Sequence, residues 1–174
     1  MAEAILLIGM MGSGKTTVGK EVARRFRRPF HDSDADVLGR TGMTVPELFA
    51  ARGEAAFRAE EKAVLASALS SARPSVVAVA GGAVLDPDSR RRLREGGVVI
   101  WLRARPATLV ARVGKGEGRP LLDHDAPGAL TRLYAARRLV YAGLADGVVD
   151  VEPPMSLVVD RVARLARHLL EAAS

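Results

Sequence analysis

Gly9-Met10-Met11-Gly12-Ser13-Gly14-Lys15-Thr16-Thr17 is a stretch near the start of the chain with the spacing Gly-x4-Gly-Lys-Thr, which is typical of a phosphate-binding loop. Glycine allows the backbone to fold tightly, so that successive N–H groups and the start of the next helix face a polyphosphate. We expect Lys15 to reach the β- and γ-phosphates and the Thr16 hydroxyl to bind Mg²⁺. The alternative is an ordinary glycine-rich turn. The motif makes phosphoryl transfer the first hypothesis but does not identify the acceptor.

The sequence on either side of this loop supports the motif. Before it, the continuous apolar run of residues 4–8 is typical of a buried parallel strand. After it, apolar residues recur at helical spacing at Val18, Val22, Ala23 and Phe26. Strand, glycine loop and helix therefore occur in the order that a phosphate-binding loop requires.

Length and composition indicate one compact domain over residues 1–174. A chain of 174 residues with 48% hydrophobic content can form one sizeable core and leaves no room for a second domain. The chain has no cysteine, which excludes disulfides and thiolate metal sites, and its three scattered histidines form no zinc motif. The apolar run at residues 4–8 is too short for a signal peptide or a membrane span. We expect a cytoplasmic protein with no membrane contact.

The net charge of +6 comes mainly from arginine. A basic excess can indicate nucleic-acid binding, but these arginines are spread along the chain, and aromatic residues for base stacking make up only 4% of it. The densest cluster, residues 90–94, follows the helix start signal Asp86-Pro87, and we interpret it as the outer face of a helix. We expect no nucleic-acid partner. Part of the positive surplus can attract anionic small ligands.

Apolar runs and helical patterns alternate along the chain. Further strands are predicted at residues 28–31, 75–80, 98–102 and 147–151. Helical patterns lie at residues 44–71, 108–113, 130–144 and 157–170. Thr44-Val45-Pro46-Glu47 has the pattern of a capping box, and we expect Gly53 to split the longest pattern into two helices. The alternation predicts an α/β fold with a five-stranded parallel sheet covered by helices on both faces.

A glycine-rich segment interrupts the pattern between two predicted helices. Residues 114–120 contain three glycines and three charged residues, one of which is Arg119. An ordinary surface loop is one interpretation. A phosphoryl-transfer enzyme must exclude water from its γ-phosphate, however, and a flexible flap carrying an arginine can do so. We therefore expect a mobile lid at about residues 113–124.

Several polar groups follow the predicted strands. Asp32 and Asp34 are one residue apart after the second strand, where one can serve Mg²⁺ and the other an acceptor hydroxyl. The alternative is that Asp32 or Ser33 caps the next helix, and both can hold together. Because ligands bind at the carboxyl ends of parallel strands, we expect these groups to lie near the phosphate-binding loop.

Two further pairs point to the same end of the sheet. Arg58 and Glu61 are three residues apart on one helix side, where an ion pair can fix the guanidinium, although a surface ion pair is the alternative. Gly81 and Gly82 close the third strand with backbone that a ligand can approach closely, although tight turns also need glycine.

Taken together, these motifs resemble those of the shikimate kinases, small P-loop proteins of the nucleoside-monophosphate-kinase-like group. The resemblance spans nearly the whole chain, and the order and spacing of its elements are specific. It depends on the phosphate-binding loop, Asp32-Ser33-Asp34, Phe57-Arg58 with Glu61, Gly81-Gly82-Ala83-Val84, Gly118-Arg119-Pro120-Leu121-Leu122, and Arg137 with Tyr141. It implies a three-layer P-loop kinase fold, with acceptor-binding helices at about residues 33–62.

The resemblance also implies two substrates, ATP and shikimate, with Mg²⁺. The nucleotide would be held by Gly12, Ser13, Gly14, Lys15, Thr16, Thr17 and Arg119, with Arg112 and either Pro153 or Pro154 at the adenine. Mg²⁺ would be bound by Thr16 directly and by Asp32 through water. Shikimate would be bound by Asp34, Phe49, Phe57, Arg58, Gly81, Gly82 and Arg137. The implied catalytic residues are Lys15, Asp34, which accepts the hydroxyl proton, and Arg119, which stabilises transition-state charge.

The chain departs from the family pattern at three places. Ala80 replaces the first of three glycines, and Gly39 stands where a glutamate is common. Arg138 directly follows Arg137, and we assign the anion-binding role to Arg137 because it lies four residues before Tyr141. Two other functions remain open: another small-metabolite kinase such as a gluconate kinase, and a non-catalytic ATP-binding regulatory module. We expect a monomer, as is typical of the family.

Overall fold

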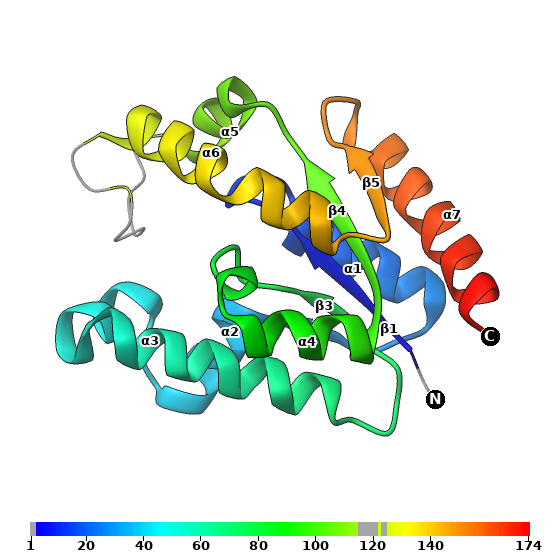
Figure 1. Ribbon diagram of the computed structural model, residues 1–174, viewed down its shortest axis with the longest axis horizontal. Coiled ribbons are helices and arrows are strands. Elements are labelled where there is room, and N and C mark those ends of the chain that lie inside the picture. Colours follow the sequence, from blue (N-terminus) through cyan, green and yellow to red (C-terminus); the bar gives the residue numbers. More distant parts are fainter. Residues whose placement is uncertain (1–2, 115–121, 123–124) are drawn as a thin grey trace.

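The computed structural model describes residues 3–114, 122 and 125–174. Its sheet has five parallel strands in the order β2-β3-β1-β4-β5 (Figure 1). The strands are β1 (Ala4–Ile8), β2 (Phe30–Asp32), β3 (Val76–Ala78), β4 (Gly97–Arg103) and β5 (Gly147–Asp150). The predicted α/β class and five-stranded parallel sheet are therefore confirmed.

Strand β1 lies at the centre of the sheet. Ile5 is paired with Val76 of β3 on one side and with Val98 of β4 on the other. Every residue of β1 is buried, which explains its continuous apolar sequence. This central position places the loop that follows β1 at the carboxyl ends of both neighbouring strands.

Seven α-helices and a short 3₁₀ helix are present in the described residues. They are α1 (Lys15–Phe26), α2 (Ser33–Thr41), α3 (Val45–Leu69), η1 (Ala83–Leu85), α4 (Pro87–Gly96), α5 (Pro106–Val113), α6 (Ala126–Leu144) and α7 (Met155–Ala173). Helices α1 and α7 pack together against one face of the sheet, whereas α4 and α6 cover the other (Figure 1). None of the helices among the described residues is long and apolar enough to cross a membrane.

The predicted boundaries differ from the observed ones by a few residues. Strand β3 ends at Ala78, two residues earlier than predicted, because the Ala80 N–H bonds to the Ser33 side chain instead of to a neighbouring strand. Helix α5 starts at Pro106, whose fixed φ suits the first helical position. The predicted capping box is confirmed, since Thr44 and Glu47 bond to each other's backbone N–H groups.

Helices α2 and α3 have a small core of their own. Val37 of α2 packs with Leu48, Phe57 and Val64 of α3, and these four residues form a cluster separate from the main core. Because α2 begins where β2 ends, this pair of helices lies beside the carboxyl end of the sheet (Figure 1). The arrangement carries Arg58 of α3 to the same end of the sheet as the loop after β1.

Gly53 breaks α3, as the sequence predicts. Its φ of 80° and ψ of 175° lie in a region that only glycine readily adopts. The part of α3 after this break carries Phe57, Arg58 and Glu61, so the break sets the direction from which these side chains approach the sheet.

Gly53→Ala should lower the free energy of unfolding by about 1–3 kcal/mol, because alanine is strained at this φ and ψ. Gly143→Ala is the matched control: this helical glycine has no atom within 4 Å of the added methyl group. The control should raise stability by about 0.5–1 kcal/mol. Urea denaturation of the two variants measures both values, and equal stabilisation by both would contradict the role of Gly53.

Part of the predicted lid and its key residue lie outside the described structure. Residues 115–121 and 123–124, including Arg119, are not among the described residues. Leu122 within this stretch is buried in the main core. The lid and the role of Arg119 therefore stay predictions.

Candidate active site

The phosphate-binding loop joins β1 to α1 in the conformation that its glycines allow. Gly12 and Gly14 have φ values of 81° and 91°, in the left-handed region that favours glycine. A methyl group on Gly12 would also lie 2.8 Å from Val113 of α5. Helix α1 starts at Lys15, directly after the loop, so its N-terminal end faces the space that a phosphate would occupy.

Lys15 and Thr16 lie at the open side of this loop. The Lys15 Nζ donates to the carbonyl oxygens of Gly9 and Met10 at 2.8 and 2.9 Å, so the lysine lies across the loop. The Thr16 hydroxyl donates to the Asp32 carboxylate at 2.5 Å. A hydroxyl and a carboxylate oxygen are ligands that suit Mg²⁺, which is often held by one or two protein groups together with phosphates.

Asp32 has both of the roles that the sequence left open. Its side chain caps α2 by accepting from the N–H groups of Asp34 and Ala35. The same carboxylate meets Thr16 through its other oxygen. Ser33 is buried and accepts from the Ala80 N–H at 3.2 Å, which joins the end of β2 to the turn after β3. These bonds fix the start of α2 and hence the position of Asp34, which lines the cleft.

Arg58 forms an ion pair that is partly buried, so the surface ion pair considered from the sequence is wrong. Its Nη1 donates to Glu61 at 2.6 Å and its Nη2 to Glu54 at 3.3 Å, and the Glu61 side chain is only 4% exposed. Burial raises the pKa of the Glu61 carboxyl group, while the charges of Arg58 and Arg137 act in the opposite direction. Although burial alone would lower it, the pKa of the Arg58 guanidinium is raised by Glu61 and Glu54. Arg58 therefore stays a cation held in one position.

The two glycines after β3 make room for two arginines. A methyl group on Gly82 would lie 2.4 Å from the Arg58 Nη1, and one on Gly81 would lie 3.3 Å from the Arg137 Nη1. The Tyr141 hydroxyl of α6 donates to the Gly81 carbonyl at 2.7 Å and fixes this turn. The glycines thus let both guanidinium groups approach the backbone at the edge of the cleft.

Arg137 is the buried arginine of the pair Arg137-Arg138. It is 3% exposed, whereas Arg138 is exposed on the same helix. Within the described part of the chain, its Nε has no hydrogen-bond partner. Burial raises the pKa of the neighbouring Tyr141 to about 12, against the effect of the Arg137 charge, so the tyrosine stays neutral. A buried cation with an unused donor at a cleft is suited to an anionic ligand.

Arg112 and the turn between β5 and α7 form the wall at the other end of the cleft. The Arg112 guanidinium donates to the carbonyls of Val151 at 2.8 Å and Gly12 at 3.3 Å. Glu152, Pro153, Pro154 and Met155 follow Val151 and also line the cleft. This wall therefore lies next to the phosphate-binding loop, where a nucleoside would extend from its phosphates.

One cleft of about 780 Å³ brings almost all the predicted site residues together. Those that line it are Gly12, Gly14, Lys15, Thr16, Thr17, Asp32, Asp34, Phe49, Phe57, Arg58, Gly81, Gly82, Arg112, Arg137 and Pro153. Ser13 does not line it, because its side chain is turned into the protein and is 1% exposed. Arg119 lies outside the described residues.

Some residues lining the cleft had no predicted role in binding. They include Met11, Val45, Ala78, Val79, Glu152 and Met155. Phe49 and Phe57 are in contact, with ring centroids 4.9 Å apart, and Arg58 lies over the Phe57 ring at 5.2 Å. Only one feature of the sequence could have identified Glu152 and Met155 as residues of the cleft, namely that they lie close to Pro153.

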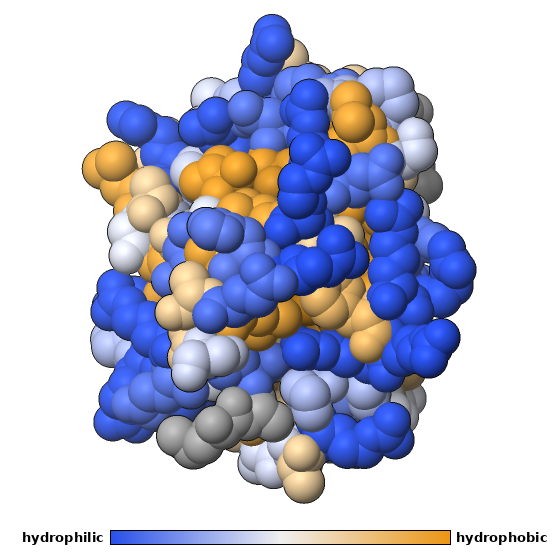
Figure 2. Space-filling model, turned by 90° about the vertical axis from the view of Figure 1, so that its right-hand side faces the viewer, coloured by the Kyte–Doolittle hydropathy of each residue, from blue (hydrophilic) through white to orange (hydrophobic). Residues whose placement is uncertain are grey.

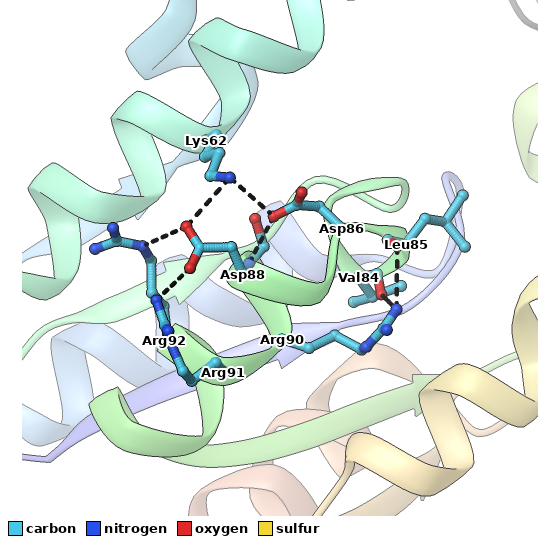
Figure 3. Close-up of polar contacts among 9 residues, drawn as sticks. Lys62, Val84, Leu85, Asp86, Asp88, Arg90, Arg91 and Arg92 are labelled. Atoms are coloured by element: carbon cyan, nitrogen blue, oxygen red, sulfur yellow. Dashed lines mark hydrogen bonds and ion pairs between the residues drawn. The ribbon is translucent and has the colours of Figure 1, made fainter.

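The arginine cluster after Asp86 lies away from the cleft and is largely paired. Figure 3 shows Asp88 between Lys62 of α3 and the side chains of Arg91 and Arg92, while Arg90 donates to the carbonyls of Val84 and Leu85. The cluster is therefore the outer face of α4, as predicted. On another face, beside β5 and α7, hydrophilic side chains surround separate hydrophobic patches (Figure 2).

Comparisons with known proteins agree with this geometry. Residues 11–167 match the family model described as shikimate kinase. A shikimate kinase of Burkholderia pseudomallei is 44% identical over 151 residues, which are 86% of this chain and 82% of that protein. A solved structure of shikimate kinase from Acinetobacter baumannii in complex with shikimate has a TM-score of 0.90 at 31% identity, covering 99% of this chain and 95% of that one.

A gluconokinase structure from Sinorhizobium meliloti has a TM-score of 0.62 at 22% identity, covers 99% of this chain and 98% of its own, and shows the fold alone. The family model extends from the phosphate-binding loop into α7 and so includes both ends of the cleft. On this match the chain belongs to the shikimate kinase family.

Proposed function

We propose that this protein transfers the γ-phosphate of MgATP to the 3-hydroxyl of shikimate, giving shikimate 3-phosphate and ADP. The observation that carries the proposal is one cleft with a phosphate-binding loop at one side and two arginines, Arg58 and Arg137, at the other. The A. baumannii relative that has the same fold was solved with shikimate bound. The residues that line this cleft suit two ligands, a nucleotide and a carboxylate.

The donor side would bind the nucleotide phosphates through the loop. The N–H groups of residues 12–17 and the N-terminal end of α1 provide positive partial charge, and Lys15 adds a full charge. Thr16 and Asp32 would hold Mg²⁺, which neutralises developing charge on the phosphates when bound. Mg²⁺ usually keeps several water ligands and is bound by one or two carboxylates together with substrate phosphates.

The acceptor side would bind the shikimate carboxylate between Arg58 and Arg137. Forked guanidinium donors match the two oxygens of a carboxylate, and burial of Arg137 strengthens the attraction. Phe49 and Phe57 would contact the ring, while the backbone of Gly81 and Gly82 would bond to ring hydroxyls. With the carboxylate and the ring held in this way, the 3-hydroxyl of shikimate would face Asp34.

Asp34 would accept the proton of this hydroxyl as the oxygen attacks the γ-phosphorus. The bond from that phosphorus to the bridging oxygen of ADP breaks, and no covalent enzyme intermediate forms. Lys15 would stabilise charge on the phosphates during transfer. The corresponding role of Arg119 in the lid stays a prediction from the sequence.

The whole chain would act as a single domain in the cytoplasm, as a monomer, with α2 and α3 as acceptor-binding helices. No nucleic-acid or membrane partner is part of this proposal. Of the two other functions, a gluconate kinase would also bind a carboxylate, so the two arginines do not separate it from a shikimate kinase; the match of residues 11–167 to the shikimate kinase family favours shikimate. A non-catalytic ATP-binding module would use Lys15 for the phosphates but would not need Asp34 in the same cleft.

A steady-state assay of ADP formation with shikimate, and with gluconate in parallel, tests the proposed function. Turnover that depends on shikimate and Mg²⁺, with no gluconate phosphorylation, is the expected result. Well-folded protein that phosphorylates gluconate only would support the other kinase. Tight ATP binding without turnover of any acceptor would support the regulatory module.

Gly82→Ala should raise KM for shikimate about 10-fold or more while changing KM for ATP little, because the methyl group would displace the guanidinium of Arg58. The φ of −90° at Gly82 suits alanine, so the backbone is not strained. Gly39→Ala is the control on α2, with no atom within 4 Å of the added methyl group. If the steady-state assay gave Gly82→Ala and Gly39→Ala the same KM for shikimate, the position assigned to Arg58 would be wrong.

A further inference from the structure

Glu152 connects the nucleotide end of the cleft to helix α5. It follows β5 directly, and one of its carboxylate oxygens accepts from the Arg105 N–H at 3.0 Å while the other accepts from the Thr108 hydroxyl at 2.7 Å. Arg105 is the N-cap residue of α5, and Thr108 lies in its first turn. The contact therefore joins segments that are more than 40 residues apart in the sequence.

These bonds give α5 a cap that its own sequence does not provide. Arg105 makes no side-chain capping bond, and Thr108 stands where a capping box has glutamate or glutamine. Glu152 supplies from outside the carboxylate that would otherwise reach back to the N-cap N–H. A negative charge is favourable at a helix N-terminus. The pKa of Glu152 is accordingly lowered by the bonds from the Arg105 N–H and the Thr108 hydroxyl, and by the charges of Arg105 and Arg112.

The same turn is held at the other end of α5. Arg112 donates to the Val151 carbonyl at 2.8 Å and to the Gly12 carbonyl at 3.3 Å. The last turn of α5 thus bonds to Val151, and the first turn bonds to Glu152. Figure 1 shows α5 and the turn after β5 at the same end of the sheet.

The residues after Glu152 depend on this attachment for their position. Pro153 and Pro154 have restricted φ angles, so the direction of the turn follows from where Glu152 is fixed. Met155 then brings its Cε to 3.3 Å from the point where a methyl group on Gly14 would lie. All three line the cleft next to the phosphate-binding loop.

We propose that Glu152 is a positioning residue for the nucleotide, which fixes the Pro153–Met155 wall against the phosphate-binding loop by capping α5. This inference rests on the proposed function, because it takes the donor to be a nucleotide. It assigns no contact between Glu152 and the nucleotide itself. The distinction can be tested through Thr108, the partner of Glu152 in this cap.

Calorimetric titration with ADP and, separately, with shikimate measures the effect without requiring turnover. Glu152→Ala should weaken ADP binding about 5- to 20-fold and leave shikimate binding unchanged, because two charge-assisted bonds to α5 are lost. Glu152→Gln keeps one acceptor oxygen and should lie between wild type and Glu152→Ala. Glu171→Ala, which removes an exposed glutamate near the end of α7, is the matched control and should bind ADP as the wild type does.

Thr108→Val removes the hydroxyl at nearly constant volume and completes a double-mutant cycle. It should weaken ADP binding in the wild-type background and add nothing in Glu152→Ala. Unchanged ADP affinity in Glu152→Ala would overturn the proposal, as would an equal loss of ADP and shikimate affinity. A full effect of Glu152→Ala with none from Thr108→Val would indicate direct contact with the nucleotide and also overturn it. Absence of phosphoryl transfer by the wild-type protein would instead refute the proposed function.

Discussion

Asp34→Asn should lower kcat about 10²- to 10⁴-fold while the Kd for ATP stays within about twofold of the wild-type value. Asparagine has nearly the same shape but cannot accept the proton of the attacking hydroxyl. The α2 cap survives, because it uses the Asp34 backbone N–H and the Asp32 side chain. Single-turnover kinetics give the chemical step, and calorimetry gives the affinity for ATP.

Asp36→Asn is the control for this substitution. Asp36 is on the same helix and contacts His31 at 3.2 Å, but it does not line the cleft. It should leave kcat within about twofold, because this half-buried contact lies outside the cleft. A small and equal loss of kcat and ATP affinity in Asp34→Asn would contradict the role of Asp34 as the proton acceptor.

Arg137→Met should raise KM for shikimate about 30- to 1,000-fold, which corresponds to the loss of a buried, charge-assisted contact with a carboxylate. Methionine fills much of the same space, so the effect on packing is small. KM for ATP should change little, because Arg137 lies at the acceptor side of the cleft. Steady-state kinetics with each substrate varied in turn measure this difference.

The neighbouring residue provides the control for Arg137. Arg138→Met removes the same charge from the same helix at an exposed position, and it should leave KM for shikimate within about twofold. If Arg138→Met had the larger effect, the assignment of the anion-binding role to Arg137 would be wrong. The unfolding temperatures of both variants show whether a loss of activity results from unfolding of the protein.

The sequence was most informative where a function depends on spacing within one segment. The phosphate-binding loop, the pair Asp32 and Asp34, and the Arg58–Glu61 pair each lie within a few residues, so local backbone geometry determines their relation. The central strand was predicted for a similar reason: residues buried on both faces must be apolar along their whole length. These segments supply the donor side of the cleft together with Asp34, Arg58 and Glu61.

What the sequence did not show depends on contacts between distant segments. The burial of Glu61 follows from the packing of α3 over the turn after β3, and an i, i+3 pair looks the same whether it is exposed or buried. Glu152 caps helix α5, which begins at Pro106, 46 residues earlier in the chain. No pattern within either segment predicts that contact. Ser13 fits the loop motif, yet its side chain is turned away from the cleft.

We predict that one cleft holds the nucleotide phosphates and the acceptor carboxylate at opposite sides. A crystal structure of the wild-type protein with ADP and shikimate bound together tests this claim most directly. We predict the ADP phosphates in the loop of residues 9–17, the carboxylate between Arg58 and Arg137, and the 3-hydroxyl within hydrogen-bond distance of Asp34. Density for the shikimate carboxylate at any other group, or for the 3-hydroxyl turned away from Asp34, would contradict it.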